Sequence, residues 1–200
     1  GRVLISGHGL NSWGSEYWWT YSWVRVTGVS RPDDLRALSY LTPDGKLVNL
    51  EPELDASGVF SGRFVYSDRN LESPPPLGDY RFVLVDTNGL EKRFTVKLDR
   101  VMENLPVMVG PRSNQEVSAT DLEISWEPVA EATTYTVHVK TMGNERLWVK
   151  RGISGTSLLY NDDGQATVEI LPSGRYIISV YAQDRRGNMA VRHIGFSVVS

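Results

Sequence analysis

The sequence predicts an all-β protein built from two tandem antiparallel β-sandwich domains. Two stretches roughly a hundred residues apart share one pattern of glycine, aromatic and aliphatic residues, and a repeat of this length is a duplicated domain. The matching residues are Gly78, Tyr80, Phe82, Leu84, Gly89, Phe94 and Val96, and then Gly174, Tyr176, Ile178, Val180, Gly187, Phe196 and Val198. We therefore expect domains at residues 1–102 and 103–200, with a boundary between 100 and 111.

Short segments of alternating apolar and polar residues predict the strands of the first domain. They are rich in valine and aromatic residues and cover residues 21–26, 38–41, 59–66, 80–85 and 93–98. Turn sequences that end at Gly45 and Gly89 separate them, because Asp and Asn start turns and Gly accepts a positive φ. The proline run at 74–76 is expected to be a rigid spacer before the strand at Tyr80. A ligand for a proline-binding module is the alternative.

The second domain shows the same alternation. Its expected strands cover residues 122–126, 135–139, 167–171, 176–182 and 194–199, and turn sequences occupy 161–164, 172–174 and 184–188. A helical apolar stripe of useful length does not compete with these patterns. Several short strands per domain, spaced by turns, indicate a sandwich.

Composition and charge exclude several functional classes. With 200 residues, 40% of them hydrophobic and 22% charged, the chain is typical of globular proteins and can build two cores. The formal net charge is −3 and neither half is basic, so nucleic acid is not an expected partner. The sequence also has no apolar run of the ~20 residues that a transmembrane helix needs.

Cysteine is absent, which removes disulfide scaffolds, thiol catalysis and thiolate metal sites. The chain begins at Gly1-Arg2 without an initiator methionine. An export signal or lipid anchor removed from the N-terminus would account for that beginning. We therefore expect an extracellular, periplasmic or cell-surface location, with a lipoprotein among the candidates.

Strand and corner residues of the second half follow the order of a known family. They are Leu122, Ile124 and Trp126 before Glu127-Pro128, then Tyr135, Val137 and Val139, and Tyr181-Ala182 before the turn at 184–187. The segment from Leu171 to Tyr176 is similar to a tyrosine corner, in which a tyrosine hydroxyl bonds to the backbone a few residues upstream. On these residues, 107–200 resemble a fibronectin type III domain.

The first half resembles a bacterial immunoglobulin-like domain through Trp23, the Asp44-Gly45 turn and Gly78-Asp79-Tyr80. It lacks the cysteine pair of antibody domains, so the resemblance is to the sandwich alone. Neither family implies catalysis. Members of both are commonly spacers, adhesion units or accessory modules of larger extracellular proteins, and the fold does not choose among these roles.

The three histidines do not form a metal or acid–base cluster by spacing. His138 and His193 alternate with apolar residues, so both are expected to be exposed on the outer face of a strand, and His8 is expected on a flexible segment. A GxSxG nucleophile motif is absent. An enzyme would need a pocket that joins His8 to carboxylates, which the strand pattern does not predict.

Adjacent carboxylates occur at Asp33-Asp34 and Asp162-Asp163, both in turn sequences. Turn aspartates usually accept hydrogen bonds from nearby backbone, so a structural role is expected. A loosely held calcium ion at Asp162-Asp163, or at the turn of Asp86 and Asn88, is the alternative, although none of these matches the twelve-residue calcium loop. No cofactor and no metal site is predicted.

Six aromatic residues within eleven positions form the one compositional anomaly; they are Trp13, Tyr17, Trp18, Trp19, Tyr21 and Trp23. If Trp23 points inward like its counterpart Trp126, then Tyr21, Trp19 and Tyr17 share the core face, and Trp18, Thr20 and Ser22 point outward. Packing explains most of this cluster. Trp13 and Trp18 are the least explained by packing, so Trp13, Tyr17 and Trp18 are the predicted ligand- or partner-binding residues.

These observations predict a non-enzymatic, exported or cell-envelope protein that binds or spaces. Its expected partner is a protein or a glycan at the cell surface. Two alternatives stay open at this point: a carbohydrate-binding accessory module that uses the aromatics near residues 13–19, and a purely structural spacer of a larger surface protein or enzyme.

Overall fold

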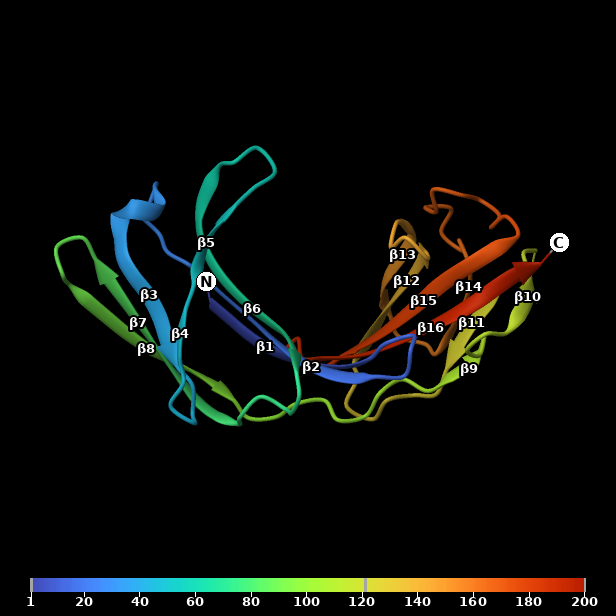
Figure 1. Ribbon diagram of the computed structural model, residues 1–200, viewed down its shortest axis with the longest axis horizontal. Helices are drawn as coiled ribbons and strands as arrows, with labels where there is room; N and C mark the ends of the chain where they lie inside the picture. The colour runs from blue at the N-terminus through green and yellow to red at the C-terminus, as the bar shows by residue number, and fades with distance from the viewer. Residues whose placement is uncertain (1, 121, 200) are drawn as a thin grey trace. The chain divides into compact units, whose positions relative to one another are not determined.

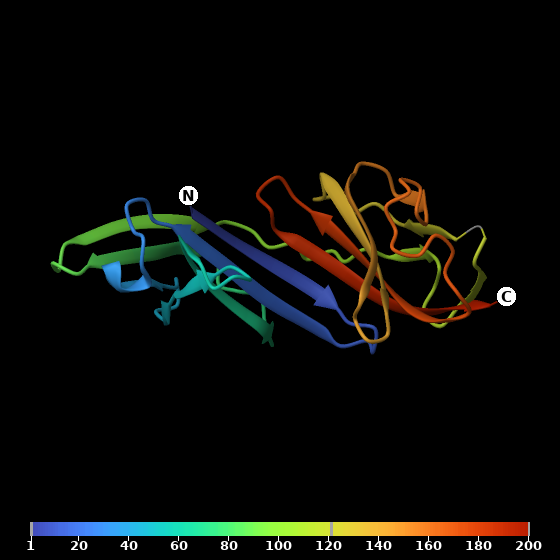
Figure 2. The ribbon, with the colours of Figure 1, turned by 90° about the horizontal axis from the view of Figure 1, so that it is seen from above.

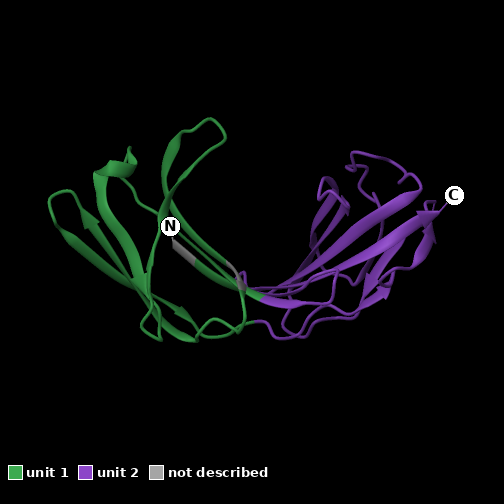
Figure 3. Ribbon diagram, viewed as in Figure 1, with its two compact units in different colours: residues 1–6, 18–101 green, residues 7–17, 102–200 purple. Residues whose placement is uncertain are grey.

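The computed structural model describes residues 2–120 and 122–199, and its regular structure is almost entirely β-strand (Figure 1). The predicted fold class is confirmed. The chain forms two compact units; the first joins the residues up to Ser6 with Trp18–Val101, and the second joins Gly7–Tyr17 with the residues from Met102 onward (Figure 3). The predicted division into domains at residues 1–102 and 103–200 stays a prediction. None of the described segments is a helix with the length and hydropathy to cross a membrane.

Two sheets make up the first unit. One sheet has the strand order β4 (Leu47–Asn49), β3 (Leu35–Leu41), β7 (Gly78–Asp86), β8 (Glu91–Leu98), and the 3-10 helix η1 (Pro32–Asp34) precedes β3. The other has the order β1 (Arg2–Leu10), β2 (Glu16–Arg25), β6 (Phe60–Leu71), β5 (Glu51–Leu54). Both sheets contribute to one core, which includes Val24, Phe64, Tyr40, Tyr80 and Phe82.

The second unit is also a two-layer sandwich. Its smaller sheet has the order β14 (Ser157–Leu159), β11 (Glu123–Trp126), β9 (Met108–Gly110). The larger sheet has the order β13 (Arg146–Ile153), β12 (Thr134–Thr141), β15 (Gly174–Gln183), β16 (Met189–Val199), and β10 (Glu116–Ser118) pairs with β16. The core lies between the layers and includes Trp126, Val137, Val139, Ile178 and Phe196.

The expected strand at 167–171 is wrong. These residues form bends and a loop, in which the backbone N–H and the hydroxyl of Thr167 both donate to the carbonyl of Leu147. Leu171 is nevertheless buried in the core. Alternating apolar residues can therefore anchor a loop to a core without a strand ladder.

The N-terminal strand β1 was not expected from the sequence, because Gly7-His8-Gly9 offers little side-chain alternation. Its second half pairs in parallel with β16, from Gly7 opposite Met189 to Leu10 opposite Arg192. β1 also lies beside β2, as both views of the ribbon show (Figures 1 and 2). The hairpin between β1 and β2 consequently belongs to the second unit.

A tyrosine corner occurs in both units. The Tyr176 hydroxyl donates to the carbonyl oxygen of Pro172 at 2.8 Å, as the sequence predicts. The Tyr80 hydroxyl makes the same bond to the carbonyl oxygen of Pro76 at 2.9 Å. Pro76, the last residue of the proline run, therefore supplies the hydrogen-bond acceptor of this corner. The internal repeat therefore extends to this tertiary hydrogen bond.

Candidate functional site

Trp13 lies at the tip of the β1–β2 hairpin, and 81% of its surface is exposed. The side-chain amide oxygen of Asn11 accepts hydrogen bonds from the backbone N–H groups of Trp13 and Ser15, and Gly14 closes the turn with a φ of 86°. A side-chain acceptor of this kind fixes the turn backbone. The indole is therefore presented to solvent by an ordered turn.

Tyr17 fixes the base of this hairpin to the second unit. Its ring lies directly against Gly9, where an added Cβ would overlap the phenol ring. Its hydroxyl lies 3.0 Å from Nε2 of His193, and the two rings are parallel within 8°. Tyr17 is thus a half-buried positioning residue.

The predicted orientation of β2 is wrong. The buried residues of this strand are Thr20, Ser22 and Val24, so Trp19, Tyr21 and Trp23 lie on the outer face, where each is half-buried. Trp18, expected outside, is half-buried and paired with Leu71 of β6. The buried aromatic side chains of the first core come from β3 and β7 instead, where Tyr40 packs against Tyr80 and Phe82.

An arginine organises the outer aromatics of β2. The guanidinium of Arg63 lies 5.1 Å from the ring centre of Trp23, donates to the Tyr21 hydroxyl and pairs with Glu53 at 2.9 Å. A cation over an exposed indole is worth about 0.5–1 kcal/mol. This contact explains how large aromatics remain ordered on an outer face.

His138 and His193 are not the exposed strand residues that the sequence predicts. Both are half-buried, because Tyr181 packs against each ring at centroid distances of 4.8 and 6.1 Å. Nδ1 of His193 is 2.7 Å from the hydroxyl oxygen of the fully buried Ser179. Nδ1 of His138 is buried and has no hydrogen-bond partner among the described residues.

Burial controls the charge of these two imidazoles. It lowers the pKa of His138 from 6.5 to about 4, and the positive charges of Lys140, Arg146 and Arg151 act in the same direction. Burial also lowers the pKa of His193 to about 4, with a further contribution from Lys140. Both rings are therefore neutral at physiological pH.

His8 is buried rather than flexible. Its Nδ1 lies 3.0 Å from the backbone carbonyl oxygen of Glu103, and its Nε2 lies 3.8 Å from a carboxylate oxygen of Glu16. The Glu16 side chain is largely exposed, whereas only 7% of the His8 side chain is. The contact with Glu103 holds β1 against the segment that follows Met102 in the second unit.

The paired aspartates serve the structure. Asp34 accepts from the backbone N–H groups of Ser30 and Arg31, and these bonds lower its pKa. Asp163 accepts from the indole N–H of Trp148 at 2.8 Å, and Lys150 lies within 3.3 Å of carboxylate oxygens of both Asp162 and Asp163. Among the described residues, no group of three or more His, Cys, Asp or Glu is arranged to hold a metal ion.

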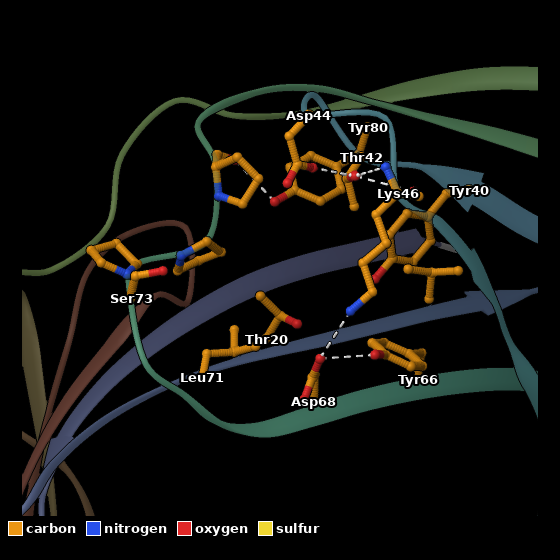
Figure 4. A pocket seen from close by; sticks show the side chains of 14 residues that line it. Thr20, Tyr40, Thr42, Asp44, Lys46, Tyr66, Asp68, Leu71, Ser73 and Tyr80 are labelled. Atoms are coloured by element: carbon orange, nitrogen blue, oxygen red, sulfur yellow. Dashed lines mark hydrogen bonds and ion pairs between the residues drawn. The ribbon is translucent and has the colours of Figure 1, made fainter.

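A cavity of about 170 Å3 opens between the two sheets of the first unit (Figure 4). Three tyrosines, Tyr40, Tyr66 and Tyr80, line it together with Thr20, Leu71 and the loop of Ser73 and three prolines. The Tyr66 hydroxyl donates to Asp68 at 3.0 Å, and the ammonium of Lys46 lies 3.5 Å from the same carboxylate. Figure 4 shows both groups directed at Asp68.

The tyrosines of this cavity stay protonated. Burial raises the pKa of Tyr80 to about 12, and the Asp44 carboxylate adds to the rise. Burial likewise raises the pKa of Tyr66, reinforced by its hydrogen bond to Asp68. The Tyr66 and Tyr80 hydroxyls donate to Asp68 and to the carbonyl of Pro76. The cavity therefore presents hydroxyl oxygens, aromatic edges and carboxylates, which suit a small cationic group.

Sequence reasoning missed this cavity. A partial signal was present, because Tyr66 and Asp68 are spaced by two and share one face of β6, while Thr42 and Lys46 flank the turn between β3 and β4. Their convergence needs the register of three strands, which one sequence does not provide. The predicted site residues differ in their surroundings: Trp13 is exposed, Tyr17 packs on His193 and Trp18 is half-buried.

Comparison with known proteins adds little. No protein-family model and no curated protein sequence matches the chain. Solved structures similar to it include the BSP domain of a biofilm associated protein, at 14% identity and a TM-score of 0.30, covering 99% of this chain and 29% of that one. A tetra-tandem repeat in the extending region of a large adhesion protein is similar at 13% identity and a TM-score of 0.31, covering 99% and 50%.

A third structure is SGBP-B of the Bacteroides ovatus mixed-linkage glucan utilization locus, in complex with a mixed-linkage heptasaccharide. The identity is 15% and the TM-score 0.25, covering 90% of this chain and 42% of that one. The chain spans half or less of the length of each of the three. Likeness at these TM-scores carries no inference about what the chain binds.

Proposed function

We propose that this chain is a non-enzymatic binding module of an exported or cell-envelope protein, and that it contacts a protein or glycan through the hairpin that carries Trp13. One observation carries the proposal: the largest side chain type in proteins is 81% exposed at the tip of an ordered turn. Tryptophans that become buried when a complex forms are frequent anchors of interfaces. Truncating such a residue to alanine typically weakens binding by about 2 kcal/mol or more.

The hairpin is organised before any partner arrives. Asn11 holds the turn, Gly7 to Leu10 pair with β16, and Tyr17 rests on Gly9 and His193. A contact surface that is already ordered loses less conformational entropy on binding. Tyr17 therefore acts as a positioning residue and Trp13 as the contact.

The non-enzymatic part of the proposal is supported by the use of all three histidines in packing. His8 contacts Glu103 and Glu16, His193 contacts Tyr17 and Ser179, and His138 packs on Tyr181. Catalytic imidazoles need access to a substrate proton. The cavity in the first unit is lined by none of them.

A role as a spacer is the second candidate. Two sandwiches with their own cores suit an extended surface protein, and the resemblance to fibronectin type III and bacterial immunoglobulin-like domains agrees with that role. A pure spacer has no need of an indole in solvent, which favours the binding role. The same proposal includes export of the protein by a signal sequence, with a lipid-anchored protein among the candidates.

Replacing Trp13 with alanine is expected to reduce partner capture at least tenfold while leaving the melting temperature unchanged, since the indole contacts little else in the unit. Capture is measured on a broad glycan panel and on envelope preparations of the producing cells. Leu90→Ala is the matched control, because Leu90 is 72% exposed beside a hairpin turn of the first unit. Equal capture by Trp13→Ala and wild type would exclude the hairpin as the contact.

A further inference from the structure

Packed tyrosines form one wall of the cavity in the first unit. The rings of Tyr40 and Tyr66 lie 6.2 Å apart at 83°, and those of Tyr40 and Tyr80 lie 5.6 Å apart at 60°. The tyrosine corner to Pro76 fixes Tyr80, and the bond to Asp68 fixes Tyr66. Rings at these distances pack against one another in the core, and the edges that they leave free form part of the cavity wall.

The charges at this cavity favour a cation. Asp68 and Asp44 line the cavity, and Lys46 is its only positive group among the lining residues. The Thr42 hydroxyl donates to the Asp44 carboxylate. A formal excess of one negative charge beside aromatic rings attracts organic cations and disfavours anions.

The protein already places an ammonium group there. Nζ of Lys46 lies 3.5 Å from Asp68, and the Lys46 side chain is 59% exposed. Exposed ion pairs of this kind contribute little to stability. A ligand cation can therefore replace Lys46 at Asp68 at little energetic cost.

Size and exposure narrow the ligand class. A water molecule needs roughly 10–15 Å3 of such space, so the cavity of about 170 Å3 has room for a small organic group. Tyr40 and Tyr80 are 2% and 1% exposed, so neither offers the broad open face on which a sugar ring stacks. Three acidic ligands for a metal ion are not assembled here within the described part of the chain.

We propose that this cavity binds the ammonium group of an organic amine, with Asp68 as the counter-ion, the three tyrosines as one wall and Lys46 as an internal competitor. The group can come from a free methylated amine or from a lysine side chain of a partner peptide. This site is independent of the Trp13 hairpin, so either proposal can fail without the other.

Titration of the intact chain with choline, followed by amide chemical shifts in NMR, tests the proposal. We expect saturable shifts confined to the cavity residues, and none with 3,3-dimethylbutan-1-ol, the uncharged isostere of choline. A parallel titration with acetyl-lysine methylamide and its norleucine analogue distinguishes the peptide source from the free amine. Equal binding of the charged and uncharged members in both pairs would overturn the proposal, as would the absence of saturable shifts in both.

Three variants sharpen this test. Asp68→Asn keeps the shape but removes the counter-ion, so affinity is expected to fall about tenfold or more. Lys46→Met removes the competitor, so affinity is expected to rise severalfold. Asp33→Asn changes an exposed carboxylate in η1, before the opposite end of β3, and should leave affinity unchanged. Thermal melts identify a misfolded Asp68 variant, in which case an unchanged or weakened affinity in Lys46→Met overturns the proposal.

Discussion

Replacing Val24 with aspartate is expected to destabilise the first unit by more than about 4 kcal/mol, a cost large enough to unfold many domains. Val24 is 5% exposed and lies in the core with Phe64 and Tyr40. The variant loses the burial of an aliphatic side chain and places an unpaired carboxylate in an apolar environment. Urea unfolding followed by circular dichroism measures the loss.

The neighbouring substitution Trp23→Ser is the matched control. It removes a larger side chain, yet the expected cost is only about 1 kcal/mol, since Trp23 is half-buried on the outer face under Arg63. If Trp23→Ser unfolds the unit and Val24→Asp does not, then the strand has the opposite orientation.

Lowering the pH from 7 to 4 is expected to destabilise the second unit by about 2–4 kcal/mol, after allowance for the partial exposure of its two half-buried histidines. Burial holds the pKa of both His138 and His193 at about 4, below the ordinary 6.5, so the folded state favours the neutral rings. As the pH falls through 6.5 the unfolded chain takes up these protons first. The stability from burial is thus complete above pH 6.5 and is lost between 6.5 and 4.

Chemical denaturation at several pH values measures this dependence. Replacing both histidines with glutamine is expected to flatten the profile between pH 6.5 and 4. Asp163 of the second unit has a lowered pKa, so its contribution to stability is lost only as the pH falls below about 3.8, the ordinary value for aspartate. A profile that is flat in the wild type, or equally steep in the double variant, would contradict the assignment.

The second unit was largely predictable because local and tertiary signals agree there. Trp126, Tyr135 and Ile178 alternate with polar residues and are buried, and the bond from Tyr176 to Pro172 follows from the local corner sequence. Such features depend on residues close together in the chain. The same logic holds for the strands and turns of the first unit.

The orientation of β2 was not predictable, since aromatic residues alternate with small polar ones and both faces are partly covered. Thr20 and Ser22 are buried, which inverts the usual preference. The burial of His193 could not be predicted from the sequence either, because Tyr17, which packs against it, is 176 residues away in the chain. The candidate surface around Trp13 was found from composition, whereas the cavity needs strand register.

Hydroxyl-radical footprinting of the six tryptophans, with and without envelope preparations of the producing cells, tests the proposed binding role most directly. In the free chain we expect Trp13 to be modified fastest, and Trp126 and Trp148, each 2% exposed, to be the most protected. In the bound state the modification of Trp13 should fall severalfold while the others are unchanged. Binding that leaves the modification rate of Trp13 unaltered would contradict the account.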